Sequence, residues 1–429
     1  MENLWKLEGI PAYVGGELNP VLYNCGSGMK ADFDGPTDED SYMQIVTKTE
    51  REEFDAYCAL LEKEGFEKVF ANENEAGVYF QFAGKKNVYA YYVFNERTAR
   101  IIWDNSGVLV SDFADSAKTC VHDDTALMQF GLLYGDMIKK VTCDCGMLYA
   151  IRLRDNRVIV VDGGEIEQAT EPATDDFMAR LLSLTGNPEK VIIAAWFCTH
   201  PHDDHMDFFC RMLNKFGSRL HVERAMFNFA SESLVGSTFN ESSRSRIKTM
   251  ERIKANNPEV KYLKLHTGQK FELAGAEVEV ILTHEDILSL HAPRAYEGMN
   301  ETSTILKFSF DGKSFIILGD AHVSNGNVII GRYPAGALSC DFLQVAHHCI
   351  NNVENIYAFI KTEYMLIPEG RYLLLKFIYD HYRIVARYCG YDKAIVAGDA
   401  TAVFRAQDGK LLKTEFFPVC GCPYDGSER

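Results

Sequence analysis

The 429-residue chain lacks the features that mark secreted and membrane-spanning proteins. Its first sixteen residues, MENLWKLEGIPAYVGG, contain no basic stretch followed by an apolar core, which a secretion signal would have. Elsewhere, every apolar run is shorter than the ~20 residues that a helix needs to cross a bilayer. These absences exclude a membrane span and predict a cytoplasmic location.

Basic charge is also scarce, because 44 Lys and Arg residues are outnumbered by 61 Asp and Glu residues, for a net charge of −17. Nonspecific affinity for nucleic acid comes mainly from Lys and Arg side chains that neutralise phosphates. The charge therefore argues against a long nucleic acid as partner, although it does not exclude a small phosphoester. We expect a small-molecule substrate, and the sequence leaves the oligomeric state open.

Cysteine is present, but its pattern does not predict a disulfide framework. Twelve cysteines in a chain without an export signal are typical of reduced thiols. Cys143 with Cys145, and Cys420 with Cys422, form CxC pairs that could bind metal. Neither pair has a second pair or a histidine nearby, so incidental thiols are the favoured interpretation.

The length favours two domains. Residues 1–122 are predicted to form a small α+β domain. Thr47 to Gly65 has the apolar spacing of an amphipathic helix, and the runs GVYFQF, NVYAYYVF and TARIIWD that follow are typical of strands. The aromatic residues of these runs favour a packed sheet face over a ligand-binding face.

Residues 123–429 alternate between strand and helix patterns, which favours α/β layering. One strand is expected over residues 190–197, one over LHVERAMFNFA, and one helix over Tyr372 to Tyr388. A hairpin with its turn at Asp311-Gly312 is expected within TSTILKFSFDGKSFIILGD.

The motif THPHDDH, which follows the strand expected at 190–197, contains His200, His202, Asp204 and His205. Burying these groups unpaired is costly, whereas neutral imidazoles and carboxylates are suitable metal ligands. His200 and His202 lie two residues apart and point the same way in an extended segment, so they can hold one ion. Asp204 and His205 begin the next helix and can hold a second. The spacing disfavours a polar loop of solvated histidines and predicts a dinuclear site.

Three other expected strand ends carry residues of the same kind. Val158 to Val161 end at Asp162, which either orients a metal ligand or is a turn carboxylate. The hairpin ends at Asp320, whose carboxylate is suited to bridge two cations. A third strand ends at His347 and His348. Adjacent side chains of an extended chain point to opposite sides, so we expect one of these to bind metal and the other to contact substrate or pack.

In chain order, the four strand ends carry DGG, THPHDDH, GD and HH. This series resembles the metallo-β-lactamase superfamily of metal-dependent hydrolases over about residues 125–400. The resemblance implies an αβ/βα sandwich with its site at the sheet edges. The predicted fold class is therefore α/β, a four-layer metallo-β-lactamase-like sandwich preceded by a small α+β domain.

The resemblance also implies roles for individual residues. His200 and His202 match the ligands of the first metal, and Asp320 matches the bridging aspartate. The last family histidine is followed by glycine, where this chain has Cys349, so the choice between His347 and His348 stays open. The implied metal ligands are His200, His202, Asp204, His205, Asp320, His348 and Asn300, and the candidate catalytic residues are Asp204, His347 and Asp162.

The first metal's remaining ligand has no clear histidine counterpart. Among the residues before Asp320, Asn300 is nearest the expected place, and we rank it above His284, while His291 is also available. An amide oxygen is a weaker ligand than imidazole, so the first metal would be held less tightly.

The implied chemistry is hydrolysis by water activated between two divalent ions, zinc by default and iron or manganese as alternatives. The resemblance to a branch that includes phosphodiesterases favours a small phosphoester as substrate. The rival interpretation is a binding or regulatory protein that keeps the fold and is catalytically weakened.

Overall fold

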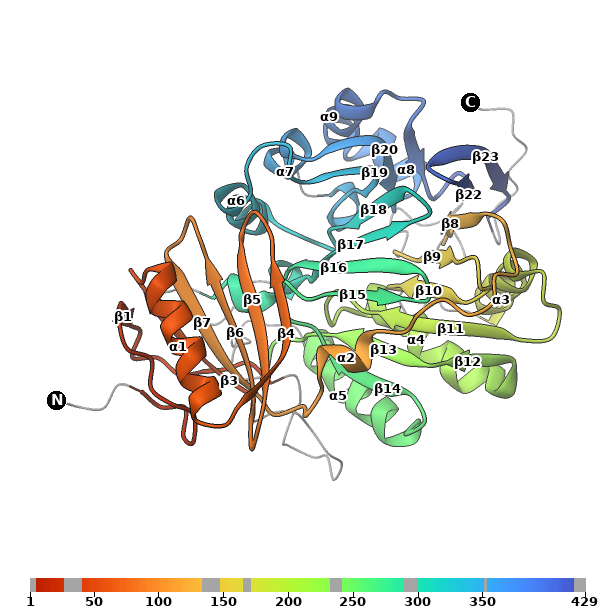
Figure 1. Cartoon of the computed structure of the whole chain (residues 1–429). Helices are drawn as coiled ribbons and strands as arrows, with labels where there is room; N and C mark the ends of the chain where they lie inside the picture. Colours follow the sequence, from red (N-terminus) through yellow and green to blue (C-terminus); the bar gives the residue numbers. More distant parts are fainter. Residues whose placement is uncertain are drawn as a thin grey trace.

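The computed structural model describes residues 5–26, 41–132, 147–164, 171–231, 241–288, 299–350 and 353–419. Within these ranges, three β-sheets and the helices around them make up the architecture in Figure 1. Two of the sheets face each other and form the larger part of the molecule. The third, built from the N-terminal residues, lies against their side.

Sheet I is the first half of this sandwich. In spatial order it contains β14 (Lys261–Lys264), β13 (Arg224–Phe227), β11 (Val191–Phe197), β10 (Val158–Val161), β9 (Tyr149–Arg152), β8 (Thr125–Gln129), β22 (Thr401–Gln407) and β23 (Lys410–Phe417), and β12 (Leu220–Val222) pairs with β11. All four residues of β10 are completely buried, as expected for a strand covered on both faces.

Sheet II is the other half. In spatial order it contains β15 (Lys270–Leu273), β16 (Ala276–Leu282), β17 (Ile305–Phe310), β18 (Lys313–Ile317), β19 (Ser339–Gln344), β20 (Lys361–Ile367) and β21 (Ala394–Val396). Aromatic side chains join the two sheets: the rings of Phe197 and Phe308 lie 5.2 Å apart, and those of Tyr149 and Phe315 lie 5.3 Å apart.

Helices cover the outer faces of both sheets. On sheet I they are α3 (Glu171–Thr185), α4 (Asp203–Phe216) and α5 (Glu241–Asn256). On sheet II they are α6 (Val323–Arg332), α7 (Glu354–Phe359), α8 (Arg371–Lys376) and α9 (Tyr379–Cys389). The order helix, sheet, sheet, helix confirms the predicted four-layer α/β fold class.

The N-terminal sheet contains β1 (Glu17–Leu18), β3 (Tyr42–Thr47), β7 (Thr98–Asp104), β6 (Asn87–Val93), β5 (Gly77–Ala83) and β4 (Glu67–Glu73) in spatial order, and β2 (Tyr23–Asn24) pairs with β3. Helix α1 (Arg51–Lys63) packs on one face. The other face, which includes Tyr79, Tyr89 and Tyr91, packs against the sandwich. The predicted domain boundary at residue 122 falls between β7 and β8 and stays a prediction.

Local predictions had mixed outcomes. The hairpin turn at Asp311-Gly312 is confirmed, with positive φ at both residues, as a type I′ turn requires. The single helix expected over Tyr372 to Tyr388 is wrong, because the chain breaks between α8 and α9 around Phe377 and Ile378. Aromatic and β-branched side chains lose rotamer freedom in a helix, which favours a break there.

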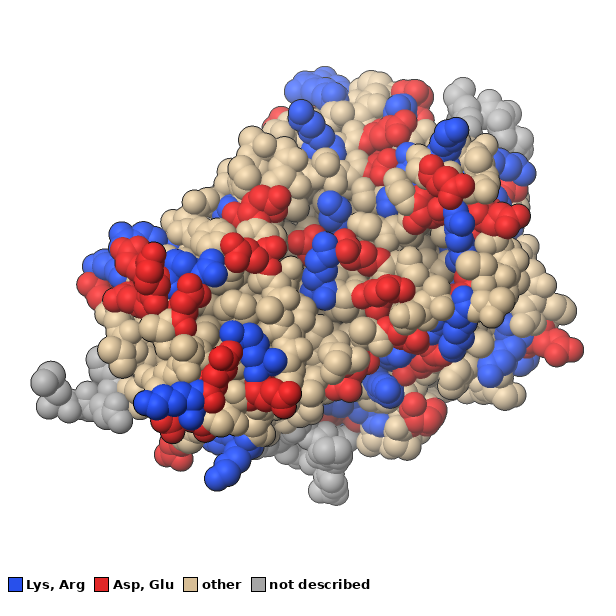
Figure 2. Space-filling view, viewed as in Figure 1, with Lys and Arg blue, Asp and Glu red and all other residues tan. Residues whose placement is uncertain are grey.

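The strand expected over LHVERAMFNFA is also two strands, β12 and β13, separated at Glu223. The eight cysteines that the structure describes are all free thiols, while the two CxC pairs lie outside the described residues. No helix within the described ranges has the length and apolar character needed to span a lipid bilayer. On the face in Figure 2, acidic and basic side chains are interspersed.

Candidate metal centre

Four strand ends meet at one edge of the sandwich. Strands β10 and β11 run parallel in sheet I, and β18 and β19 run parallel in sheet II, so within each sheet the two carboxyl ends lie side by side. Asp162 follows β10, and the loop with His200 follows β11. Asp320 follows β18, and His348 follows β19. The two sheets thus contribute opposite walls of one site.

The polar side chains at this edge form two groups, each with its ligand atoms within 4.8 Å of one another. One group is Asp204, His205, Asp320 and His348, and the other is His200, His202 and Asp320. Asp320 belongs to both groups. These two groups therefore contain six of the seven predicted metal ligands, and one carboxylate lies between them.

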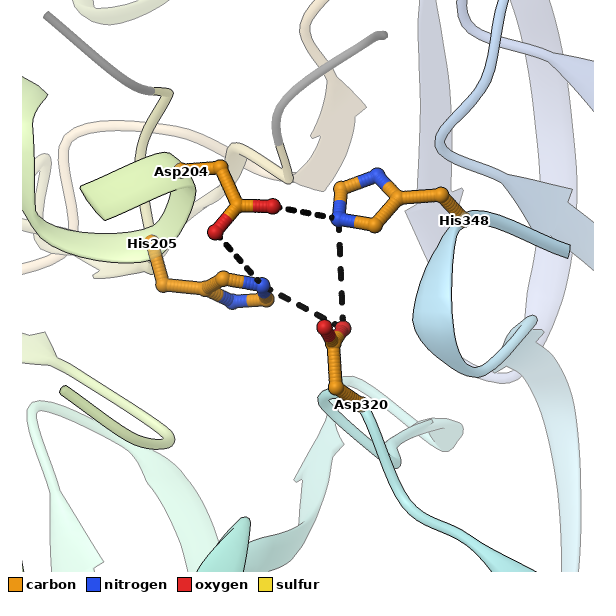
Figure 3. Close-up of side chains that lie close together, drawn as sticks. All are labelled: Asp204, His205, Asp320 and His348. Atoms are coloured by element: carbon orange, nitrogen blue, oxygen red, sulfur yellow. Dashed lines mark ion pairs between the residues drawn. The ribbon is translucent and has the colours of Figure 1, made fainter. Parts of the chain in front are cut away.

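In the first-named group, shown in Figure 3, the side chains converge on a small space. His205 Nε2 lies 3.2 Å from Asp320 Oδ1, and His348 Nε2 lies 2.9 Å from Asp204 Oδ2 and 3.9 Å from Asp320 Oδ1. Asp204 and His205 come from the first turn of α4, so the start of one helix supplies two candidate metal ligands.

In the other group, His200 Nε2 lies 3.8 Å from Asp320 Oδ2, the second oxygen of the shared carboxylate. The rings of His200 and His202 lie 4.5 Å apart. The two imidazoles therefore face one space, as their spacing in the sequence predicts. Each oxygen of Asp320 faces a different group.

Asp162 orients His205 from behind. Its Oδ2 accepts hydrogen bonds from His205 Nδ1 and from the hydroxyl of Thr199, each at 2.8 Å, and its Oδ1 accepts one from the backbone N–H of Thr199 at 2.7 Å. Asp162 has φ +58°, which turns the chain at the strand end. A Cβ atom on the next residue, Gly163, would lie 2.6 Å from Cβ of Phe208 in α4, so glycine allows the metal-bearing helix to approach.

Three further groups hold the imidazoles of His200 and His348, and none of them was predicted from the sequence. The hydroxyls of Thr199 and Ser303 lie 3.2 and 3.3 Å from Nδ1 of His200. The carbonyl oxygen of Pro368 lies 3.0 Å from Nδ1 of His348. Thr199 stands within the motif and could have been found there, whereas a backbone carbonyl leaves no signal in the sequence.

The donor atoms fit divalent cations. Among the described residues, the buried side-chain atoms of the centre without a hydrogen-bond partner include Nε2 of His200, His202 and His205, both carboxylate oxygens of Asp320, and Oδ1 of Asn300. Leaving buried polar atoms unsatisfied costs on the order of 1–3 kcal/mol each. Coordination to a cation removes that cost, and imidazole nitrogen with carboxylate oxygen is a common donor set for zinc, iron and manganese.

The electrostatics also favour cations. Burial lowers the pKa of His200 well below its ordinary value, which keeps this imidazole neutral and able to act as a ligand. Burial would lower the pKa of His205 as well, but the carboxylates of Asp320, Asp204 and Asp162 outweigh it and raise that pKa well above the ordinary value. The carboxylates thus create a place that attracts positive charge.

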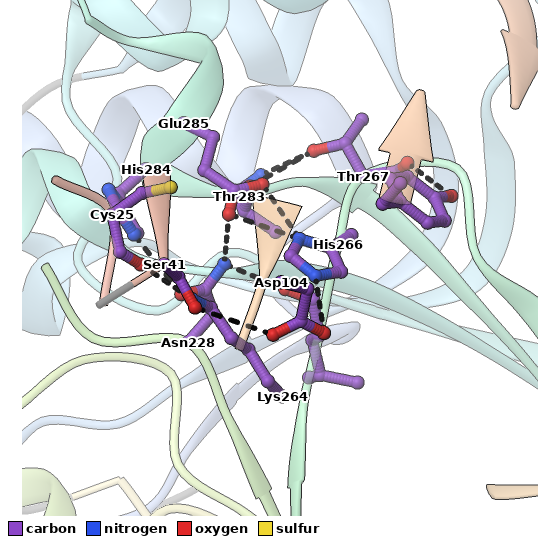
Figure 4. A network of polar contacts seen from close by, with 12 residues as sticks. Cys25, Ser41, Asp104, Asn228, Lys264, His266, Thr267, Thr283, His284 and Glu285 are labelled. Carbon is purple, nitrogen blue, oxygen red and sulfur yellow. Dashed lines mark hydrogen bonds and ion pairs between the residues drawn. The ribbon is translucent and has the colours of Figure 1, made fainter. Parts of the chain in front are cut away.

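His284 does not lie with these groups. Its Nε2 lies 3.1 Å from Oδ1 of Asn228 in a separate buried cluster, shown in Figure 4. His291 lies outside the described residues. Asn300 does lie at the centre, because its Nδ2 is 3.1 Å from Nε2 of His347. The ranking of Asn300 above His284 as a ligand stays a prediction.

The premise used for His347 and His348 is wrong. These residues are not part of an extended strand, because they form a tight turn with φ +47° and +51° after β19 has ended. The rule that adjacent side chains point to opposite sides therefore does not apply to them.

No protein-family model and no curated protein sequence matches the chain. Among solved structures it is similar to the diiron β-hydroxylase CmlA from Streptomyces venezuelae, with 11% identity over 64% of this chain and 52% of that chain and a TM-score of 0.35. The chain thus spans about half the length of CmlA.

It is also similar to zinc-bound PqqB from Methylobacterium extorquens, with 12% identity over 67% of this chain and 99% of that chain and a TM-score of 0.37. The metallo-β-lactamase fold protein YhfI from Bacillus subtilis gives 10% identity over 67% and 99%, with a TM-score of 0.35. These TM-scores are low, so the fold is described from the chain's own layers: helix, sheet, sheet, helix. This layer order agrees with the sandwich that the resemblance of the sequence motifs implies.

Proposed function

We propose that this chain is a hydrolase that holds two divalent cations at the sandwich edge and cleaves a small phosphoester. The observation that carries the proposal is the pair of ligand groups that share Asp320, with buried nitrogen and oxygen atoms directed at one another. The donors are nitrogen and oxygen without thiolate, so zinc is the first choice and iron or manganese the alternatives.

Two cations in this position would supply Lewis acidity and lower the pKa of a bound water from 15.7 towards about 7. The protein's own contribution is to present each imidazole correctly. Asp162 accepts a hydrogen from Nδ1 of His205, and the Pro368 carbonyl accepts one from Nδ1 of His348. Because Nδ1 is held in this way, Nε2 is the ring nitrogen that points towards Asp320 or Asp204 and would bind a cation.

Asp204 acts from the opposite side of the same group. Its carboxylate lies 2.9 Å from His348 and 3.7 Å from His205, and it begins a helix whose N-terminus carries partial positive charge. Burial would raise the pKa of Asp204, but the imidazoles of His205 and His348 outweigh it and lower that pKa. Asp204 is therefore proposed as an ionised carboxylate that is both a ligand and a catalytic group that accepts a hydrogen bond from the attacking water. Asp162 is proposed as a positioning residue, since it contacts His205 and Thr199.

The substrate class is proposed from two observations. The HH ending and complete HxHxDH motif resemble the branch that contains phosphodiesterases. The net charge of −17 and the mixed charges on the face in Figure 2 disfavour binding along a nucleic-acid backbone. Together they favour a small phosphoester, and no membrane or nucleic-acid partner is proposed.

The experiment has two steps. Elemental analysis of the purified chain is expected to find two divalent ions per chain. The loaded protein is then assayed against phosphodiesters, phosphomonoesters, thioesters and lactams, and the phosphodiesters are expected to be hydrolysed fastest. Full occupancy with no turnover on the whole panel would contradict the proposal and favour the binding or regulatory role.

A further inference from the structure

Three consecutive residues at the end of β19 adopt left-handed backbone conformations. His347, His348 and Cys349 have φ values of +47°, +51° and +64°. Non-glycine residues rarely adopt such values, which cost of order 1–3 kcal/mol each and persist only where the surroundings impose them. Strain of this kind clusters at functional sites, so the strained turn suggests that these side chains have a function.

The turn brings two adjacent side chains to the same carboxylate. His347 Nε2 lies 3.7 Å from Oδ2 of Asp320, and His348 Nε2 lies 3.9 Å from Oδ1. The two rings lie 6.3 Å apart at an angle of 68°. In an extended strand these side chains would point to opposite faces of the sheet. The left-handed turn therefore lets one dipeptide reach both sides of the centre.

Each oxygen of Asp320 thus has two imidazoles beside it. Oδ1 faces His205 at 3.2 Å and His348 at 3.9 Å. Oδ2 faces His200 at 3.8 Å and His347 at 3.7 Å. His347 consequently occupies, on the side of His200 and His202, a place equivalent to the one that His348 occupies on the other side.

We propose that His347 is a protein ligand of the first metal and supplies the imidazole that the stretch before Asp320 lacks. This inference deepens the proposed function and rests on its dinuclear centre. His347 Nε2 now faces Nδ2 of Asn300 at 3.1 Å, so metal binding exchanges an amide N–H for the cation. The backbone of Asn300 is held in place, because its main-chain carbonyl accepts a hydrogen bond from the backbone N–H of Ser303 at 3.0 Å.

The decisive variant is His347→Asn, because asparagine tolerates left-handed backbone and preserves the turn. We expect the wild-type chain to bind two zinc or cobalt(II) ions. In the variant, the dissociation constant of one ion should rise by more than about a hundredfold, beyond the 10–100-fold typical of residues that only position a ligand. The other ion should keep its affinity, and the cobalt(II) absorption spectrum should lose the bands of one site.

The matched control is His381→Asn. His381 contacts the same turn, through a 3.1 Å hydrogen bond from Nδ1 to the carbonyl of Cys349, and is half-buried. This variant should keep two ions with unchanged constants. Thermal unfolding of both variants, measured without metal, checks that the fold is retained, and His347→Ala serves as a second test if His347→Asn does not fold.

Two results would overturn the inference, and they are distinguishable. If His347→Asn keeps both ions at wild-type affinity while turnover falls, His347 contacts substrate and not metal. If the wild-type chain itself binds fewer than two ions, the dinuclear centre of the proposed function fails, and this is seen before any variant is compared.

Discussion

The described residues include two buried clusters of histidines and carboxylates, and these differ in how completely their polar atoms are paired. The first is the candidate metal centre. The second, called here the interface network, is Asp104, Lys264, His266, Thr267 and Glu285 (Figure 4). It joins the N-terminal sheet to the sandwich.

In the interface network, every ring nitrogen of His266 has a partner. Nδ1 lies 3.0 Å from Oε1 of Glu285, and Nε2 lies 3.3 Å from Oδ2 of Asp104. Lys264 Nζ donates to the carbonyl of Cys25 at 2.5 Å, and the Tyr89 hydroxyl donates to the carbonyl of Thr267 at 2.9 Å. The protein itself satisfies this cluster.

In the metal centre, by contrast, the Nε2 atoms of His200, His202 and His205 are buried without hydrogen-bond partners among the described residues. Both clusters use the same residue types at similar burial. Residue composition and burial therefore do not distinguish a structural cluster from a ligand site. The presence or absence of hydrogen-bond partners at the buried polar atoms does.

The largest effect is expected from breaking the metal centre. His202→Ala removes a first-metal ligand, so turnover should fall on the order of a thousandfold or more, because the pKa of the attacking water is no longer lowered. Metal content should fall as well, while the unfolding free energy of the metal-free protein stays close to wild type. Elemental analysis and steady-state kinetics measure these outcomes, and full activity in the variant would contradict the assignment.

The reciprocal change is His266→Ala in the interface network. It leaves the buried carboxylates of Asp104 and Glu285 without their partner, which should cost about 3–5 kcal/mol of unfolding free energy. Metal content should stay at the wild-type value. Urea unfolding followed by circular dichroism measures the loss of unfolding free energy. A drop in metal content without destabilisation would show that the interface network serves metal binding, which contradicts its structural role.

The pH dependence sharpens the same comparison. Burial would lower the pKa of His266, but Glu285 and Asp104 outweigh it and raise the pKa from 6.5 to about 9. Because the folded value is the higher one, this stabilisation is complete below pH 6.5 and is lost as the pH rises through about 9. The loss should be on the order of 3 kcal/mol. Unfolding of the metal-free protein across this range measures it, and His266→Gln should remove that part of the slope.

The smallest effect is expected from Asp162→Asn. This change keeps the size of the side chain and weakens its hold on Nδ1 of His205. Metal affinity should fall about 10–100-fold, as is typical for residues that orient a ligand. Competition with a chelator measures the constant. A larger loss, equal to that of His202→Ala, would show that Asp162 does more than orient His205.

Much of the centre could be predicted because its residues stand at the ends of strands with strong local patterns. The apolar run before His200 and the DG turn before Asp320 are short-range signals. The turn at His347 could not be predicted, since non-glycine residues adopt positive φ in only a few per cent of cases and tertiary contacts impose it here.

The interface network was missed for a different reason. His266 lies 162 residues from Asp104 along the chain, and no periodic pattern links them. The N-terminal strands β3 and β4 were also missed. In β4 the side chains are largely exposed and several are charged, so no apolar alternation marks the strand. Contacts of this kind arise from the packing of whole layers, which a single sequence does not encode locally.

Asp320 has a consequence for how the centre fills. Its two oxygens face two different sets of imidazoles, so an ion that arrives on either side fixes the carboxylate for the ion on the other. In the proposed dinuclear centre the two occupancies would be thermodynamically linked, and each ion would change the affinity of its neighbour by the same factor. Titration with a single metal should therefore deviate from the curve of two independent sites, and the chain would then respond to metal supply as one unit.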